Sequence, residues 1–253
     1  MKTEQEKLDY INKECNTDYK SLDEVDWHYI SMNLILTEDF IREFSDKVEW
    51  VRISYTQKLS VDFIREFSDK VEWYYISKYQ KLSEDFILEF RDKVDWYWIS
   101  RYQKLSENFI RDCQDEVEWD YISECQNLSE KFIIEFKDKV DWLRISAYQK
   151  LSETFIRDYR DKLDWECISQ YQNLSEPFIR EFQDDVKWDC ISAYQKLSLT
   201  FIREFQDKVY WSYISEYQIL SKELLREFKD KINWSTVLNR EDMRDTLIDK
   251  LIN

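Results

Sequence analysis

The chain has 253 residues, no glycine and a single histidine, His28. Without glycine it cannot form a phosphate-binding P-loop, a dinucleotide-binding fingerprint or a nucleophile elbow, because each needs positive φ or close backbone approach to a ligand. One histidine excludes zinc sites with two imidazole ligands. The 53 acidic and 37 basic residues give a formal net charge of −16, which disfavours nucleic acid as a partner. Composition therefore favours a non-enzymatic protein without cofactor or metal.

We expect an intracellular protein. The first residues, MKTEQEKLDY, are too charged for a secretory signal peptide, and no apolar run is long enough to span a bilayer. The cysteines are odd in number and lack a framework spacing, so a disulfide-stapled secreted fold is not expected. The cysteines are Cys15, Cys113, Cys125, Cys167 and Cys190.

The N-terminal region is predicted to cap a repeat array. In residues 1–20, Leu8, Ile11 and Cys15 recur at helical spacing, which predicts an N-terminal cap helix. Residues 21–35 form a degenerate repeat that contains Trp27 and Ile30. Arrays need such caps because the apolar face of a terminal repeat would otherwise be exposed.

Ten of the eleven tryptophans follow one another at intervals of 23 residues. Such a period is typical of a tandem array in which each repeat buries its apolar face only against its neighbours. Eight full repeats occupy residues 36–219 and a partial repeat occupies residues 220–239. The periodic tryptophans are Trp27, Trp50, Trp73, Trp96, Trp119, Trp142, Trp165, Trp188, Trp211 and Trp234.

The first part of each repeat predicts a helix, helix A. We number the repeat positions from the leucine that opens each repeat, such as Leu82. Position 2 is serine, or Thr37 in the first repeat, and both are good N-caps. Apolar residues follow at positions 5, 6, 9 and 13, and Pro177 lies in the first turn, where proline is tolerated.

The second part predicts helix B, with Trp at position 15, Ile at 18, Ser at 19 and Gln at 22 on one face. Aspartate at position 11 recurs in every repeat, so a cap at position 11 is the preferred start, with the acidic residue at 14 as the alternative. Pairs such as Glu43 with Lys47 would instead suit a helix A extended to position 12. Each helix is expected to have two to three turns.

These elements together predict an all-α fold, an αα-solenoid with two short helices per repeat and nine to ten repeats between capping helices. A broad apolar stripe in residues 240–253 predicts a C-terminal cap helix. The absence of a linker-like segment favours one domain over residues 1–253. The stripe consists of Met243, Leu247, Ile248, Leu251 and Ile252.

The recurring residues have structural interpretations. We interpret the periodic tryptophans as the spine of the core, and the aspartates at position 11 as caps rather than a metal site. The serine at repeat position 19 and the glutamine at position 22 predict either a buried hydrogen-bond ladder or a polar ligand groove. Cys113 and Cys125 are interpreted as small core fillers, and adjacent-repeat spacing argues against a Cys167–Cys190 disulfide.

Repeat positions 16, 17 and 20 vary between repeats and lie opposite the buried face of helix B. In the first half of the chain they carry aromatic and basic residues, the types enriched at protein interfaces. The alternative is that these rings only pack over neighbouring helices. The candidate binding residues are Tyr74, Tyr75, Lys78, Tyr97, Trp98, Arg101 and Tyr121.

The repeat, written L-S-E-x-F-I-x-E-F-x-D-K-V-D-W-x-x-I-S-x-Y-Q-K, resembles a tandem 23-residue repeat of proteins from giant DNA viruses. The resemblance covers residues 21–239. It implies a repeat protein with no established catalytic residues and, for a viral protein, a location in the host cytoplasm.

The main hypothesis for function is a scaffold that binds a protein partner, with the identity of the partner and the oligomeric state of the chain left open. The alternatives are a nucleic-acid-binding helical repeat, which the negative charge disfavours, and a structural or self-assembling protein.

Overall fold

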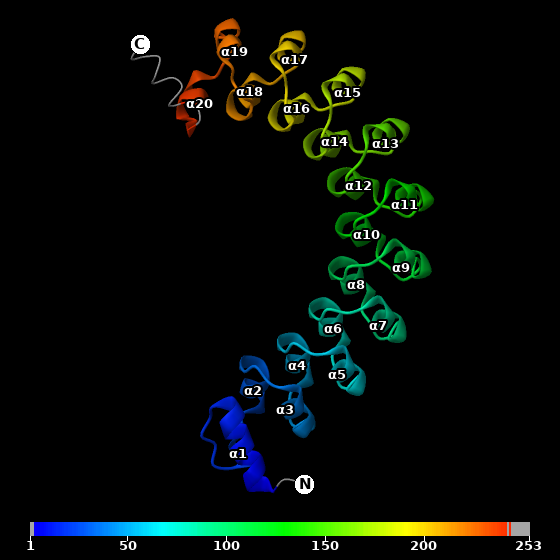
Figure 1. The fold of residues 1–253 in the computed structure, drawn as a ribbon, viewed down its shortest axis with the longest axis vertical. Coiled ribbons are helices and arrows are strands. Elements are labelled where there is room, and N and C mark those ends of the chain that lie inside the picture. The colour runs from blue at the N-terminus through cyan, green and yellow to red at the C-terminus, as the bar shows by residue number, and fades with distance from the viewer. Residues whose placement is uncertain (1–2, 242, 244–253) are drawn as a thin grey trace. The chain divides into compact units, whose positions relative to one another are not determined.

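A computed structural model describes residues 3–241 and 243, and within these residues every regular element is helical. The chain divides into two compact parts, an N-terminal unit of residues 1–122 and a C-terminal unit of residues 123–253. In each unit, short helices alternate between two layers (Figure 1). The predicted αα-solenoid is thus confirmed. That residues 1–253 form one domain remains a prediction.

The A helices form one layer and the B helices the other, and successive B helices pack against one another within each unit. Each helix A has six residues, and each helix B has seven, or six in the last one. The A helices are α3 (Glu38–Glu43), α5 (Val61–Glu66), α7 (Glu84–Glu89), α9 (Glu107–Asp112), α11 (Glu130–Glu135), α13 (Glu153–Asp158), α15 (Glu176–Glu181), α17 (Leu199–Glu204) and α19 (Lys222–Glu227). The B helices are α2 (Trp27–Asn33), α4 (Trp50–Thr56), α6 (Trp73–Tyr79), α8 (Trp96–Tyr102), α10 (Trp119–Cys125), α12 (Trp142–Tyr148), α14 (Trp165–Tyr171), α16 (Trp188–Tyr194), α18 (Trp211–Tyr217) and α20 (Trp234–Asn239).

Helix A begins where the sequence predicts. The Ser60 hydroxyl accepts a hydrogen bond from the Phe63 backbone N–H at 3.2 Å, and Pro177 lies in the first turn of α15. The predicted length of two to three turns is wrong, because helix A ends at repeat position 8 with fewer than two turns. The interpretation of Glu43 and Lys47 as a pair within helix A is wrong for the same reason, since α3 ends at Glu43.

Helix B begins at the tryptophan, so the preferred cap at position 11 is wrong and the alternative at position 14 is correct. The residue at position 14 can be the N-cap of helix B without a hydrogen bond from its side chain, as Glu72 is for α6. The backbone N–H of Glu72, which makes no side-chain cap, donates to Ser54 Oγ of the preceding repeat at 2.9 Å. Asp69, at position 11, is exposed and accepts a hydrogen bond from Lys93 Nζ of the next repeat at 2.6 Å.

The centre of each repeat is formed by the phenylalanine and isoleucine of helix A and the isoleucine of helix B. Phe63, Ile64 and Ile76 are completely buried, whereas Trp73 is half-buried. The Trp73 ring lies 4.9 Å from that of Phe90 in the next repeat, and its indole N–H donates to the Ser68 carbonyl at 3.0 Å. The periodic tryptophans therefore line the edge of the core rather than forming its spine, which corrects the sequence interpretation.

The serine and glutamine of helix B form the predicted hydrogen-bond ladder. The side chain of Gln80 donates from Nε2 to the Gln57 carbonyl at 2.7 Å and accepts at Oε1 from the Leu59 backbone N–H at 3.1 Å. Both glutamines are buried. The amide of Gln80 is therefore occupied by backbone hydrogen bonds, one of them to the preceding repeat, as the ladder interpretation predicts.

The two ends of the array differ from the repeats. Helix α1 (Glu4–Cys15) opens with a capping box between Thr3 and Glu6, buries Leu8 and Ile11, and is followed by the 3-10 helix η1 (Leu22–Glu24). At the other end, Arg240 donates to the Ser215 and Gln218 carbonyls at 2.9 Å, where a glutamine would otherwise bond. Of the predicted C-terminal cap, Met243 is buried. The remaining cap residues, Leu247, Ile248, Leu251 and Ile252, lie outside the described residues.

Candidate functional site

The predicted binding residues all lie on helix B of the N-terminal unit, on α6, α8 and α10. Because repeat positions 18, 19 and 22 face the core, positions 16, 17 and 20 project away from it. Tyr74 is 41% exposed and Tyr97 is 38% exposed, while Tyr75, Trp98 and Tyr121 are half-buried. These rings therefore contact neighbouring side chains and still present part of their surface to solvent.

The rings form a continuous series of contacts across three B helices. Trp98 meets Tyr74 edge to face at 5.4 Å and Tyr97 at 4.6 Å, with interplanar angles of 85° and 83°. Tyr97 in turn meets Tyr121 at 4.7 Å. Edge-to-face pairs at these distances attract beyond simple burial of apolar area, so the rings hold one another in place.

Three further tyrosines, which the sequence interpretation did not place in the site, extend this group. Tyr55 lies 5.4 Å from Tyr75, Tyr79 lies 5.2 Å from Tyr55, and Tyr102 stacks on Trp98 at 5.6 Å. Tyr79 and Tyr102 occupy repeat position 21, which most repeats fill with tyrosine. That recurrence was a usable signal, because position 21 lies off the buried face of helix B. We call these three tyrosines and the seven predicted residues the aromatic–cation cluster.

Two cations lie among the rings. Lys78 Nζ is 3.9 Å from the centre of the Trp98 ring, and the Arg101 guanidinium is 5.1 Å from that of Tyr121. Partial desolvation lowers the pKa of Lys78, but the phenols of Tyr79, Tyr74 and Tyr102 outweigh it, so the pKa is raised overall. The lysine is therefore charged at neutral pH, and an ammonium over an indole is a favourable cation–π contact.

A hydrogen bond joins the hydroxyl groups of Tyr121 and Tyr97 at 2.7 Å, with Tyr121 as donor. This bond, together with the nearby Arg101 and Lys78 charges, lowers the pKa of Tyr97 below its ordinary value. The cations of the cluster thus favour the ionised form of the Tyr97 phenol.

A groove of about 460 Å³ adjoins the cluster between the C-terminal ends of α6 and α8. Its lining consists of Lys78, Tyr79, Gln80, Lys81, Leu82, Tyr102, Gln103 and Lys104. The corresponding groove in the C-terminal unit has a volume of about 390 Å³ and contains Ala147 and Asn173 in place of Lys78 and Lys104. The groove is a regular product of the repeat, and its charge depends on the variable positions.

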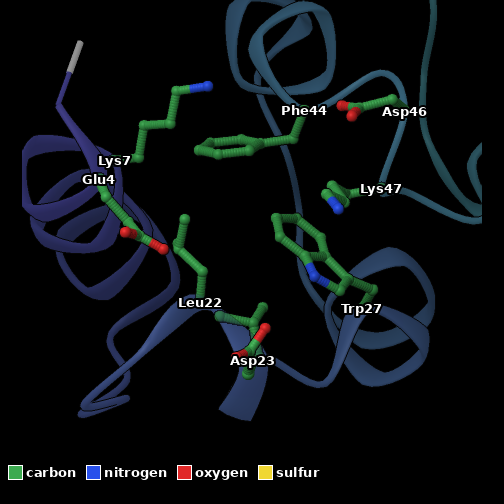
Figure 2. Close-up of a pocket in the computed structure, with 9 residues that line it drawn as sticks. Glu4, Lys7, Leu22, Asp23, Trp27, Phe44, Asp46 and Lys47 are labelled. Carbon is green, nitrogen blue, oxygen red and sulfur yellow. The ribbon is translucent and has the colours of Figure 1, made fainter.

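A separate pocket of about 390 Å³ lies between α1, η1 and the first repeats (Figure 2). It occupies the place where a regular helix A is missing before α2. The Trp27 and Phe44 rings, 5.2 Å apart, line it, and within the described residues the Trp27 indole nitrogen makes no hydrogen bond. Charges of both signs surround these rings, so no single ligand charge is favoured. The charged lining residues are Glu4, Lys7, Asp23, Asp46 and Lys47.

Burial keeps three of the cysteine thiols from being activated. Burial raises the pKa of Cys15, Cys167 and Cys190 to about 11, so these thiols are protonated at neutral pH. No disulfide joins Cys167 to Cys190. Cys113 is a buried core residue as predicted, but Cys125 is exposed, which corrects its interpretation as a core filler.

In the part of the chain that the structure describes, no three His, Cys, Asp or Glu side chains come together as a candidate metal site. No helix in residues 3–241 and 243 combines the length and apolar character that crossing a bilayer requires.

No protein-family model, curated protein or solved structure matches this chain.

Proposed function

We propose that this protein is a non-enzymatic helical-repeat scaffold that binds another protein through the aromatic–cation cluster. The observation that carries the proposal is the series of partly exposed rings in mutual contact with two cations, Lys78 and Arg101, held among them. Aromatic residues and arginine dominate the energetics of protein interfaces because they bury large areas at low entropic cost. The resemblance to repeat proteins of giant DNA viruses supports an action in the cytoplasm of an infected cell.

The contrast between the two units supports the assignment to the N-terminal unit. At the positions equivalent to Tyr74, Tyr75 and Lys78, α14 carries Glu166, Cys167 and Gln170, and α16 carries Asp189, Cys190 and Ala193. The backbone framework of the repeats is the same, because the serine and glutamine ladder recurs in both units. The ladder fixes the helices while these positions change, which is how a repeat scaffold encodes a partner.

A capture experiment tests the proposal. Immobilised wild-type protein and a Trp98→Ala, Tyr75→Ala double variant are exposed to lysate from cells that naturally contain the protein, and bound proteins are quantified. We expect the double variant to lose specific partners while its melting temperature falls by less than about 5 °C, since both rings are only half-buried.

The matched control removes two exposed tyrosines outside the cluster, Tyr171 and Tyr194, by substitution with alanine. It should retain every partner of the wild type. The proposal is wrong if the double variant captures the same proteins as the wild type, or if its melting temperature collapses, which would place the rings in the core. Concentration-dependent light scattering of the protein alone would instead support self-assembly.

A further inference from the structure

The charged side chains of the A helices are paired from one repeat to the next. Arg65 contacts Glu89 at 2.7 Å, and the same contact, from an arginine to a glutamate 24 residues later, recurs in both units. Further such pairs include Arg42 with Glu66, Arg157 with Glu181, Arg180 with Glu204, and Arg203 with Glu227, at 2.6–2.8 Å. On this surface the chain neutralises its own cations.

The helix-B surface has paired cations as well. Arg52 lies 3.9 Å from Glu49, and Arg144 lies 3.7 Å from Asp141 and also contacts Glu124. A carboxylate partner is thus the usual arrangement for an arginine in this chain, as expected from its excess of acidic residues.

Lys78 and Arg101 depart from this arrangement. Their partners are the Trp98 ring and the tyrosine rings and hydroxyls of the cluster, and no carboxylate within the described residues comes within 4 Å of either cation. In a chain with a net charge of −16, two cations held among rings without a carboxylate form a local region of opposite sign. Such a region attracts a carboxylate from outside, because a charge-assisted hydrogen bond to a cation is about twice as strong as a neutral one.

The adjoining groove extends the positive charge. Lys81 and Lys104 are exposed, make no ion pair within the described part of the chain, and line this groove with Lys78. The corresponding groove in the C-terminal unit keeps one of the three lysines, since Lys150 is equivalent to Lys81. Ala147 and Asn173 stand there in place of Lys78 and Lys104. The accumulation of positive charge is therefore specific to the groove beside the cluster and is not imposed by the repeat.

We infer that the aromatic–cation cluster and its groove bind a short acidic segment of a partner protein, an inference that rests on the proposed function. Carboxylates of the segment pair with Lys78, Arg101 and the groove lysines, and an apolar side chain of the segment packs on the exposed parts of Trp98 and Tyr74. A short acidic segment fits this surface better than nucleic acid does. Its few carboxylates can pair with the four cations Lys78, Lys81, Arg101 and Lys104, whereas the net negative charge of the chain repels a long polyanion.

The test selects a displayed library of random 12-residue peptides against the full-length wild type, a Lys78→Gln, Arg101→Gln double variant, and a Trp98→Ala variant. The matched control is Arg65→Gln, which removes a cation that is already paired on the A-helix surface. Circular dichroism establishes that each variant is folded. Enriched peptides are then synthesised with their Asp and Glu residues intact or replaced by Asn and Gln, and binding is measured by fluorescence anisotropy.

We expect the wild type and Arg65→Gln to enrich acidic peptides that contain an apolar anchor. Binding should weaken about tenfold or more in the Lys78→Gln, Arg101→Gln variant and with the amide versions of the peptides. Peptides that depend on Trp98 but show no enrichment of Asp or Glu would overturn this inference and leave the proposed function standing. If no enriched peptide depends on Trp98, both proposals fail. Tighter, strongly salt-dependent binding of a single-stranded RNA 12-mer would overturn the inference in favour of a nucleic-acid partner.

Discussion

Gln80 and Gln57 lie at the same position in successive repeats, and the side chain of the first is hydrogen-bonded to the backbone of the second at 2.7 Å. The oxygen of the same Gln80 amide accepts from the Leu59 N–H at 3.1 Å. One buried side chain thus satisfies a donor and an acceptor of the loop that follows α4. The equivalent bond from Gln195 to the Gln172 carbonyl, at 2.8 Å, shows that the ladder continues in the C-terminal unit.

The Gln80→Ala substitution should therefore lower the free energy of unfolding by more than the loss of a single hydrogen bond would. The substitution leaves a buried carbonyl and a buried N–H without a partner, and each unsatisfied group costs about 1–3 kcal/mol. We expect the free energy of unfolding to fall by about 2–4 kcal/mol, as measured by urea denaturation. Lys104→Ala, an exposed change nearby, should be close to neutral, and an equally small effect of Gln80→Ala would contradict the ladder.

The ladder could be predicted from the sequence because the spacing of Ile, Ser and Gln behind each tryptophan already places them on one helical face. The start of helix B was predicted only as an alternative, because the preferred cap at position 11 is wrong and the one at position 14 is correct. Glu72 makes no side-chain cap, and its N–H is instead satisfied by Ser54 of the preceding repeat, a contact between repeats that local capping rules do not contain. The extension of the cluster to Tyr55 was missed for a related reason, since its ring contacts are with Tyr75 and Tyr79 of the next B helix and depend on how the repeats stack.

Trp142→Ala tests the position of the periodic tryptophans at the edge of the core. The ring packs against Phe155 and Tyr159, at 6.3 and 5.5 Å, and Lys162 lies over it. Because the ring is half-buried, we expect a loss of about 2–3 kcal/mol in the free energy of unfolding, less than the roughly 3–5 kcal/mol of a fully buried tryptophan. Chemical denaturation measures this loss, and a value near 5 kcal/mol would restore the tryptophan as a central core residue.

Acidification should weaken the ion pairs between A helices. The hydrogen bond from an arginine of the preceding repeat lowers the pKa of Glu89, Glu181 and Glu227 below the ordinary value of 4.5. A lowered pKa in the folded state contributes stability that is complete above the ordinary pKa and is lost as pH falls through the folded value. The contribution of these pairs should therefore be constant near neutral pH and decline below about pH 4.5.

The comparison that isolates these pairs is a triple variant, Arg65→Gln, Arg157→Gln and Arg203→Gln. Its melting temperature should lie below that of the wild type at pH 7, and the gap should close as pH falls below the ordinary glutamate value. High salt should narrow the gap at pH 7, since the pairs are partly exposed. A gap that is unchanged between pH 7 and pH 3 would contradict the assignment.

The Tyr121–Tyr97 hydrogen bond allows the geometry of the cluster to be tested in the absence of any binding partner. Donation from Tyr121 lowers the pKa of Tyr97, so this phenol should ionise at lower pH than an ordinary tyrosine. The difference between the alkaline absorbance titrations of wild type and Tyr97→Phe isolates its ionisation from that of the other tyrosines. The Tyr121→Phe substitution removes the donor and should therefore move the ionisation of Tyr97 to higher pH. Arg101→Gln should move it in the same direction but less far, because the arginine bond, at 3.5 Å, is the weaker one. If Tyr97 instead ionises at the ordinary pKa of a tyrosine, and neither substitution changes that pKa, the two hydroxyl groups do not interact.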